Sequence, residues 1–103
     1  MRITKDQKLA ILNQIKNLIE NPKIYLFGSR TKDELKGGDI DLMVIVDEKK
    51  RKRYESLKIE LLVAIKGEKS IGDRKIDLII TSDSEIKKEA FLQDIYKNAI
   101  QLE

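Results

Sequence analysis

The 103-residue sequence contains no cysteine and no histidine. The absence of cysteine excludes disulfides and thiolate chemistry. The absence of histidine is more restrictive, because it removes the usual general base, the Ser-His-Asp triad and the usual zinc ligands. Any catalysis by this chain must therefore rest on carboxylates, lysine, tyrosine, hydroxyl groups or a hard metal ion bound by oxygen.

Long apolar runs are also missing. The longest aliphatic run, Leu42 to Val46, is far shorter than the roughly 18 residues of a membrane span. No apolar signal region follows the first residues, Met1 to Lys5. We therefore expect a cytoplasmic protein without a membrane partner. The net charge of +3 permits an anionic partner but does not require one.

The length predicts one domain over residues 1–103. Thr4-Lys5-Asp6-Gln7 has the form of a capping box and predicts the start of a helix. Asn21-Pro22 should end this helix, and a short strand over 23–27 should follow, closed by Gly28. The apolar stripe of the helix comprises Leu9, Ile11, Leu12, Ile15, Leu18 and Ile19.

The rest of the chain alternates in the same way. We expect helical turns over 30–35, a strand over 40–46 that is apolar on both faces, a helix from 47 to 67 and a strand over 75–81. Ser82 to Glu85 forms a second capping-box pattern before a final helical region. The expected apolar positions are Tyr54, Leu57, Leu61 and Ile65 in the third helix, and Phe91, Leu92, Ile95, Ala99 and Leu102 in the last.

The predicted order is α-β-α-β-α-β-α in a single small α/β (α+β) domain. The long, helix-containing connection between the second and third strands favours a parallel pair. The connection between the first two strands is much shorter, which suits antiparallel neighbours. We therefore predict a mixed three-stranded sheet packed with helices.

Asp39 and Asp41 begin the second strand and, one residue apart, should point to the same face. The tripeptide around Asp41, Ile40-Asp41-Leu42, recurs as Ile76-Asp77-Leu78. Parallel strands start at the same edge of a sheet, so three carboxylates should converge there. Asp73 is a rival for the third position, but it follows a glycine and has the character of a turn residue.

Gly28 and Ser29 should arrive beside these aspartates. Glycine lets a backbone N–H approach a phosphate closely, and the serine hydroxyl adds a donor. Asp39 and Asp41 would lie about 6–7 Å apart along the strand, a spacing into which two metal ions fit. Oxygen-only ligation favours Mg²⁺ or Mn²⁺. Arg30 either contacts phosphate or caps a turn.

Gly28-Ser29, a connector, Asp39-Ile40-Asp41-Leu42 and a later aspartate on a strand resemble the polymerase-β-type nucleotidyltransferase superfamily. The short length resembles its minimal nucleotidyltransferases (MNT). The resemblance covers nearly the whole chain and implies transfer of a nucleoside monophosphate from an NTP, usually ATP, to an acceptor. It implies that Gly28 and Ser29 hold the triphosphate, that Asp39 and Asp41 bind the metals, and that Asp77 is the third carboxylate and helps activate the acceptor hydroxyl.

Minimal members are commonly encoded beside a helical HEPN-domain protein, often as antitoxin and toxin, and can adenylylate a tyrosine of that partner. The resemblance thus implies an Mg²⁺-dependent antitoxin with an HEPN-type toxin as partner, and association with a partner or with itself is expected. The chain departs from many MNT members at Thr31-Lys32-Asp33, where they carry Ala-Arg-Gly, and at Gly38, where they carry serine.

Two other functions remain open at this level. One is an MNT-fold binding module with a weak or inactive site that neutralises its partner by complex formation, motivated by the departures after Ser29. The other is a small nucleic-acid binder that uses the basic run from Lys49 to Arg53. A solvated helix end accounts for that run better than nucleic-acid binding does.

Overall fold

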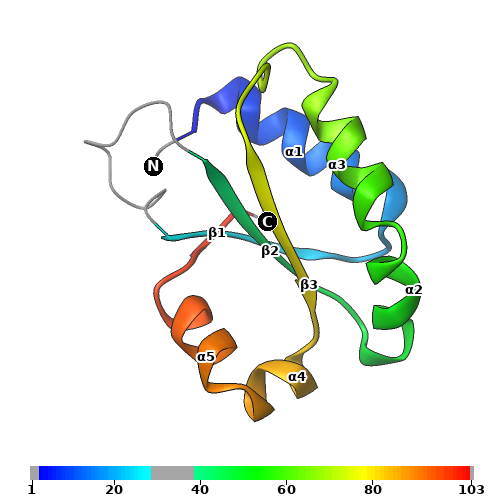
Figure 1. Cartoon of the computed structure of the whole chain (residues 1–103), viewed down its shortest axis with the longest axis vertical. Helices are drawn as coiled ribbons and strands as arrows, with labels where there is room; N and C mark the ends of the chain where they lie inside the picture. The colour runs from blue at the N-terminus through cyan, green and yellow to red at the C-terminus, as the bar shows by residue number, and fades with distance from the viewer. Residues whose placement is uncertain (1–2, 29–38, 103) are drawn as a thin grey trace.

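The computed structural model describes residues 3–28 and 39–102. Figure 1 shows a central sheet with helices packed around it. In chain order the elements are helix α1 Lys5–Leu18, strands β1 Lys23–Phe27 and β2 Ile40–Ile45, the 3-10 helix η2 Glu48–Lys50, helices α2 Arg51–Glu55 and α3 Lys58–Lys66, strand β3 Ile76–Thr81, helices α4 Asp83–Lys88 and α5 Ala90–Lys97, and strand β4 Ile100–Gln101.

The strands form one mixed sheet in the order β3-β2-β1-β4 (Figure 1). As predicted, β1 and β2 are antiparallel and β2 and β3 are parallel, which confirms the α+β class. The predicted number of strands is wrong, because β4 adds a fourth strand antiparallel to β1. Leu102, expected on the last helix, instead packs into the core, and its N–H donates to the Ile24 carbonyl at 2.7 Å.

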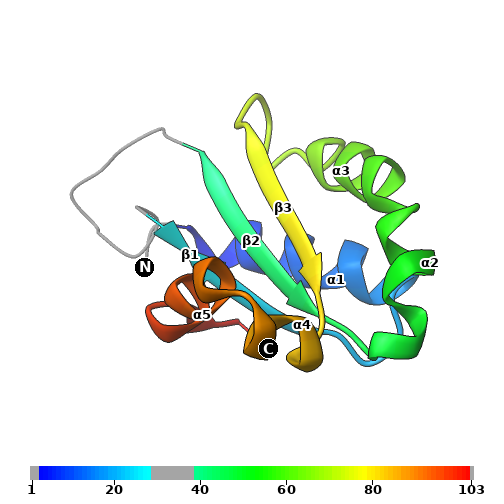
Figure 2. The ribbon, with the colours of Figure 1, turned by 60° about the horizontal axis from the view of Figure 1, so that its bottom comes forward.

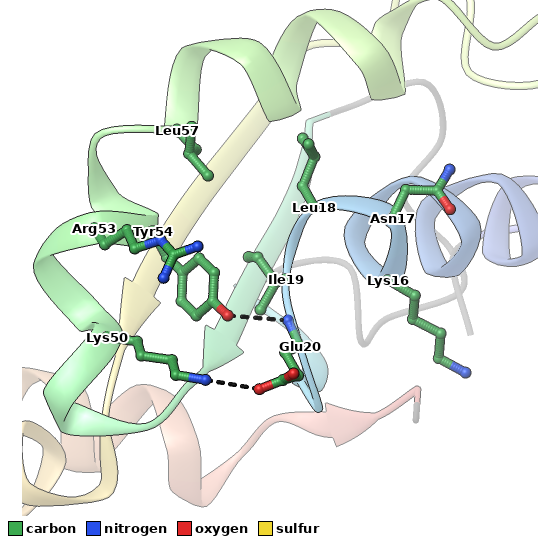
Figure 3. Close-up of a pocket in the computed structure, with 9 residues that line it drawn as sticks. All are labelled: Lys16, Asn17, Leu18, Ile19, Glu20, Lys50, Arg53, Tyr54 and Leu57. Carbon is green, nitrogen blue, oxygen red and sulfur yellow. Dashed lines mark hydrogen bonds and ion pairs between the residues drawn. The ribbon is translucent and has the colours of Figure 1, made fainter.

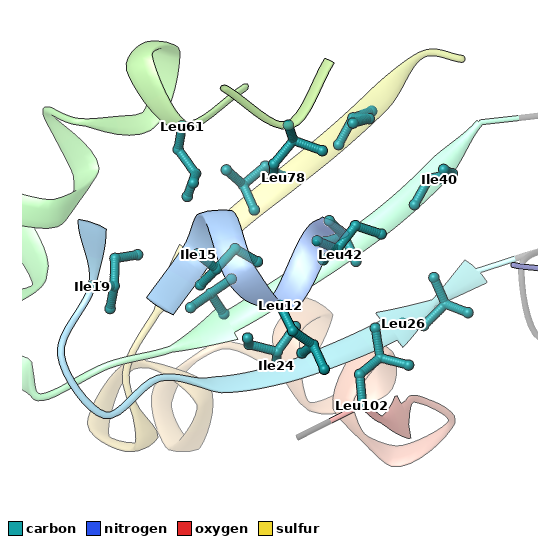
Figure 4. Close-up of a cluster of buried hydrophobic side chains, with 14 of the residues drawn as sticks. Leu12, Ile15, Ile19, Ile24, Leu26, Ile40, Leu42, Leu61, Leu78 and Leu102 are labelled. Atoms are coloured by element: carbon teal, nitrogen blue, oxygen red, sulfur yellow. The ribbon is translucent and has the colours of Figure 1, made fainter. Parts of the chain in front are cut away.

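One face of the sheet packs against α1 and α3, and this layer holds the larger core. Alternate strand residues point into it, among them Ile24 of β1, Leu42 of β2 and Leu78 of β3. Figure 4 shows these side chains meeting Ile15 of α1 and Leu61 of α3. Strand β2 is buried along almost its whole length, as its apolar sequence predicts for a central strand.

The opposite face is covered by α4 and α5 (Figure 2). The intervening strand residues, including Tyr25 and Met43, point to this side and form a smaller core with Ile86 of α4 and Leu92 of α5. Phe91 is exposed, contrary to the prediction, because the last helical region divides at Glu89 and α5 presents Leu92 to the sheet instead.

Local chemistry explains where the helices begin. Thr4 and Gln7 make both hydrogen bonds of the predicted capping box. At α4 only half of the second box forms: the Ser82 hydroxyl accepts from the Glu85 N–H, while the Glu85 carboxylate accepts from the Thr81 hydroxyl. Leu9, predicted on the apolar stripe of α1, is half exposed because helical periodicity places it opposite the buried residues, such as Ile11 and Ile15.

The region predicted as one helix from 47 to 67 consists of three shorter segments: η2, α2 and α3. The break between α2 and α3 falls at Ser56-Leu57, where the Ser56 hydroxyl bonds back to the Arg53 carbonyl. Gly67 caps α3, as predicted. None of the helices in the described parts of the chain is long and apolar enough to cross a membrane.

Candidate active site

Asp41 and Asp77 are register partners on the parallel strands β2 and β3. The two matching tripeptides pair residue for residue, Ile40 with Ile76 and Leu42 with Leu78. Asp41 is also the antiparallel partner of Phe27 on β1. Phe27, Asp41 and Asp77 therefore form one row across three strands, which we call the carboxylate row.

The carboxylate row lies on the face that α4 and α5 cover further along the strands. Residues two positions further, Met43 and Ile79, point to that face and join the smaller core. Asp41 is half-buried and Asp77 is exposed. The row is thus a solvent-accessible continuation of a packed face, so its backbone is held by the sheet while its carboxylates can reach a ligand.

Gly28 holds a special position directly after β1. Its φ of +69° lies in the left-handed region, which favours glycine. A Cβ built on this residue would lie 2.7 Å from Oδ2 of Asp41, well inside contact distance. Any larger residue would displace that carboxylate. The sequence predicted that Gly28 would reach the aspartates, and the structure places it against one of them.

Asp39 is half-buried and lies immediately before β2, outside the regular strand. The structure brings Asp41 and Asp77 together, but within residues 3–28 and 39–102 no group of three or more acidic, histidine or cysteine side chains is placed to hold a metal ion. Metal ligation by Asp39 stays a prediction. Ser29 and Arg30, and the helical turns predicted over 30–35, lie outside the described residues.

The rival aspartate is excluded from the row by its position. Asp73 lies in the turn after α3, where Gly72 has a φ of +60°. The sequence predicts Asp77, and not Asp73, as the third carboxylate because Asp73 follows a glycine and has the character of a turn residue. Sequence reasoning overlooked Phe27, the third member of the row, although the place of Phe27 directly before Gly28 on an antiparallel strand was the signal that could have found it.

Two carboxylates in one row suit a magnesium ion better than a transition metal. Mg²⁺ is commonly held by one or two carboxylates together with substrate phosphates and water, without a complete protein cage. The donors are oxygen only, which disfavours copper or a structural zinc site. Asp41 and Asp77 therefore fit a divalent cation that arrives with a polyphosphate, while a closed metal site is not required.

A separate polar hollow of about 470 Å³ lies at the other end of β1, beside the end of α1 (Figure 3). Lys50 Nζ lies 2.7 Å from Glu20 Oε1, and this hydrogen bond lowers the pKa of the Glu20 carboxyl. The Glu20 N–H donates to the Tyr54 hydroxyl at 3.2 Å. Tyr54 is 4% exposed and belongs to the larger core, as predicted, and this hollow has no place in the candidate active site.

The basic run from Lys49 to Arg53 is partly neutralised by neighbouring acids. Lys50 binds Glu20, and Arg51 lies 3.5 Å from both Glu48 and Glu85. The Asp47 side chain accepts from the Lys49 N–H. Two of the five basic residues, Lys50 and Arg51, are thus paired with acids, while Lys49, Lys52 and Arg53 are exposed, which supports the solvated helix end over a nucleic-acid patch.

Strand order, the carboxylate row and the glycine beside it define an α+β domain that presents two acidic groups next to Gly28 at one edge of its sheet. A family model described as "Nucleotidyltransferase domain" matches residues 8–101. The chain therefore belongs to the nucleotidyltransferase domain family, and its general activity is nucleotidyl transfer. Among curated proteins, none matches the chain.

Proposed function

We propose that the chain is a minimal nucleotidyltransferase that transfers AMP from ATP, with Mg²⁺ or Mn²⁺, to a tyrosine hydroxyl of an HEPN-type toxin and so acts as its antitoxin. The pairing of Asp41 with Asp77, with Gly28 packed against Asp41, carries this proposal. Since the donor is a nucleoside triphosphate, we place the reaction in the cytoplasm.

Each residue has a defined task in the proposed reaction. Asp41 and Asp77 hold up to two divalent ions, joined by Asp39. Gly28 and Ser29, with Arg30, bind the triphosphate through backbone N–H groups, a hydroxyl and a guanidinium. A divalent ion, when bound, offsets the negative charge of the phosphates. The protein therefore contributes mainly positioning and electrostatics, as phosphoryl chemistry requires.

The reaction balances without a further reagent. The acceptor oxygen forms a bond to the α-phosphorus of ATP, and the bond from that phosphorus to the oxygen bridging the β-phosphorus breaks. Pyrophosphate leaves with the bridging oxygen. The hydroxyl proton passes to the carboxylate of Asp77, whose exposed position leaves it accessible to the acceptor.

The test is incubation with labelled ATP, Mg²⁺ and the protein encoded by the neighbouring gene. Label should pass to that protein with the wild-type chain and fall at least about 100-fold with Asp77→Asn. Asp73→Asn is the matched control, because Asp73 is a nearby exposed carboxylate outside the row. Absence of transfer, or transfer that survives replacement of both Asp39 and Asp41 by alanine, would refute the enzymatic proposal.

A second candidate is a binding module that neutralises its partner without catalysis. The observations that favour it are Thr31-Lys32-Asp33 after the Gly28-Ser29 pair and the two-carboxylate, not three-carboxylate, grouping among the described residues. In this case, a chain with Asp41→Asn and Asp77→Asn would still suppress the toxicity of the partner in cells. Loss of suppression would rule the binding module out.

A further inference from the structure

An apolar groove of about 570 Å³ runs between α3 and the beginning of β3. Ile59, Leu62 and Val63 of α3 and Ile76 of β3 line it, and Lys66 and Lys75 are its charged members. We call it the α3–β3 groove. It is separate from the carboxylate row, since Ile76 points to the α1–α3 face and Asp77 to the other.

Two of the apolar side chains of this groove, Ile59 and Val63, are largely exposed. Ile59 is 76% exposed and Val63 67%, and they lie one helical turn apart. The same helix buries Leu61 and Ile65 in the core, so α3 carries a second apolar stripe on its outer side. Strand β3 is an edge strand beside it (Figure 2). Adjacent exposed apolar groups at a sheet edge indicate an interaction surface.

The groove ends at the same edge of the sheet as the carboxylate row. Its members Lys75 and Ile76 directly precede Asp77, and the Lys75 carbonyl accepts from the Ile40 N–H at 2.9 Å, next to Asp41. A protein segment lying in the groove would therefore end at the edge of the sheet that bears the two carboxylates. This position suits an acceptor protein that must present a hydroxyl there.

The charges indicate what the segment contains. Both charged residues of the groove, Lys66 and Lys75, are cations. A second copy of this chain, paired about a two-fold axis, would bring these cations toward their equivalents. A segment with apolar side chains flanked by carboxylates would bury Ile59 and Val63 and pair with the lysines.

We propose that the α3–β3 groove is the docking site for the acceptor protein, which inserts an apolar segment flanked by acidic residues and thereby presents its hydroxyl to Asp77. This inference rests on the proposed function, because it assigns the groove to the acceptor of that reaction. It adds a recognition surface that lies outside the nucleotide-binding residues.

The main test replaces Ile59 and Val63 together by serine. Phe91→Ser is the matched control, because Phe91 is 70% exposed but lies on α5. The affinity for the neighbouring gene product is measured by calorimetry without ATP, and the transfer kinetics are measured separately. We expect the double variant to weaken binding and raise KM for the acceptor at least tenfold, with kcat and KM for ATP unchanged. Phe91→Ser should match the wild type.

A charge reversal tests the electrostatic part. Lys66→Glu should weaken binding most at low salt, since exposed charges are screened as ionic strength rises. Lys97→Glu, an exposed lysine in the last turn of α5, is its control. Equal effects of the two substitutions would overturn the assignment of the groove to an acidic segment.

The outcomes separate this inference from the proposed function. If the groove variants weaken binding but the wild type transfers no label, docking stands and catalysis fails. If Asp77→Asn abolishes transfer while the groove variants behave as wild type, catalysis stands and docking is overturned. Docking is also overturned if the gene product does not bind, or if the wild type is a dimer that the groove variants dissociate.

Discussion

Asp41 and Asp77 face each other across a single strand spacing, about 4.8 Å for hydrogen-bonded neighbours. Like charges directly opposite on a sheet are destabilising. Asp41 and Asp77 lie at the solvent-accessible end of a sheet face that is otherwise apolar. A cation bound between the two carboxylates should offset their repulsion, and this effect on stability can be measured without any assay of catalysis.

The first prediction concerns stability without metal. Asp77→Asn should raise the free energy of unfolding by about 0.2–1 kcal/mol, because it removes one of two opposed charges. Addition of Mg²⁺ should raise the melting temperature of the wild type and have little effect on this variant. Thermal unfolding with and without chelator measures both effects. Asp73→Asn should leave both quantities near wild type, and equal behaviour of the two variants would contradict the role of the row.

The second prediction separates backbone strain from crowding at Gly28. Gly28→Ala should lower stability by about 1–2 kcal/mol, because alanine resists a left-handed φ, and should also reduce nucleotidyl transfer by displacing the Asp41 carboxylate. Gly72→Ala meets the same φ restriction, but its Cβ would make only an ordinary van der Waals contact, with the Lys69 carbonyl oxygen at 3.9 Å. Urea unfolding should therefore show a similar loss of stability for Gly28→Ala and Gly72→Ala. The transfer assay should show a loss of activity for Gly28→Ala and none for Gly72→Ala.

The third prediction concerns Tyr25, whose ring packs edge-on against Tyr96 at 5.2 Å. Burial, with a smaller contribution from the hydrogen bond to Tyr96, raises the pKa of Tyr25 to about 12, from an ordinary value of 10.0. The folded state therefore holds this proton more tightly than the unfolded state. Its contribution to stability is complete below pH 10 and is lost as the pH rises toward about 12.

Tyr25→Phe provides the comparison for that effect. Between pH 10 and 12, the free energy of unfolding of the wild type should fall more steeply than that of the variant, because only the wild type can lose a proton from residue 25 on unfolding. Lysine deprotonation affects both proteins alike. Parallel curves from chemical unfolding would contradict a raised pKa at Tyr25.

The fourth prediction uses two apolar residues of α1. Ile15 is fully buried and Leu9 is 49% exposed. Ile15→Ala should cost about 2–5 kcal/mol, because it leaves a cavity under the sheet, whereas Leu9→Ala should change stability by less than about 0.5 kcal/mol. Denaturant unfolding measures both. Similar costs would mean that the helix face is assigned incorrectly.

The parts of the fold that local chemistry determines could be predicted from the sequence. The Thr4–Gln7 box, the end of α3 at Gly67 and the buried β2 depend on neighbours along the chain. Errors arose where tertiary packing decides. Phe91 satisfies helical spacing but lies outside the contact with the sheet, and β4 forms only because β1 offers an edge. Propensity over two residues cannot reveal such a strand.

Some residues of the candidate site could likewise be predicted from the sequence, and others could not. The repeated Ile-Asp-Leu tripeptide and the parallel crossover sufficed to pair Asp41 with Asp77. Asp39 was harder, because it precedes the strand and strand alternation does not fix its direction. The α3–β3 groove was missed because α3 is apolar on two sides, so no pattern separates the exposed Ile59 and Val63 from the buried stripe of the same helix.

Two groups of polar side chains lie at opposite ends of β3, namely the carboxylate row at its start and a set of hydrogen bonds and ion pairs at its end. Ser82 donates a hydrogen bond to Glu48, Thr81 donates to Glu85, and Arg51 lies beside both acids. These tethers lie about 13 Å along β3 from Asp77, four residues away. Substitutions at the end of β3 that bears these hydrogen bonds can therefore change stability without moving the carboxylates. The thermal stability and the activity of this domain can thus vary independently of each other.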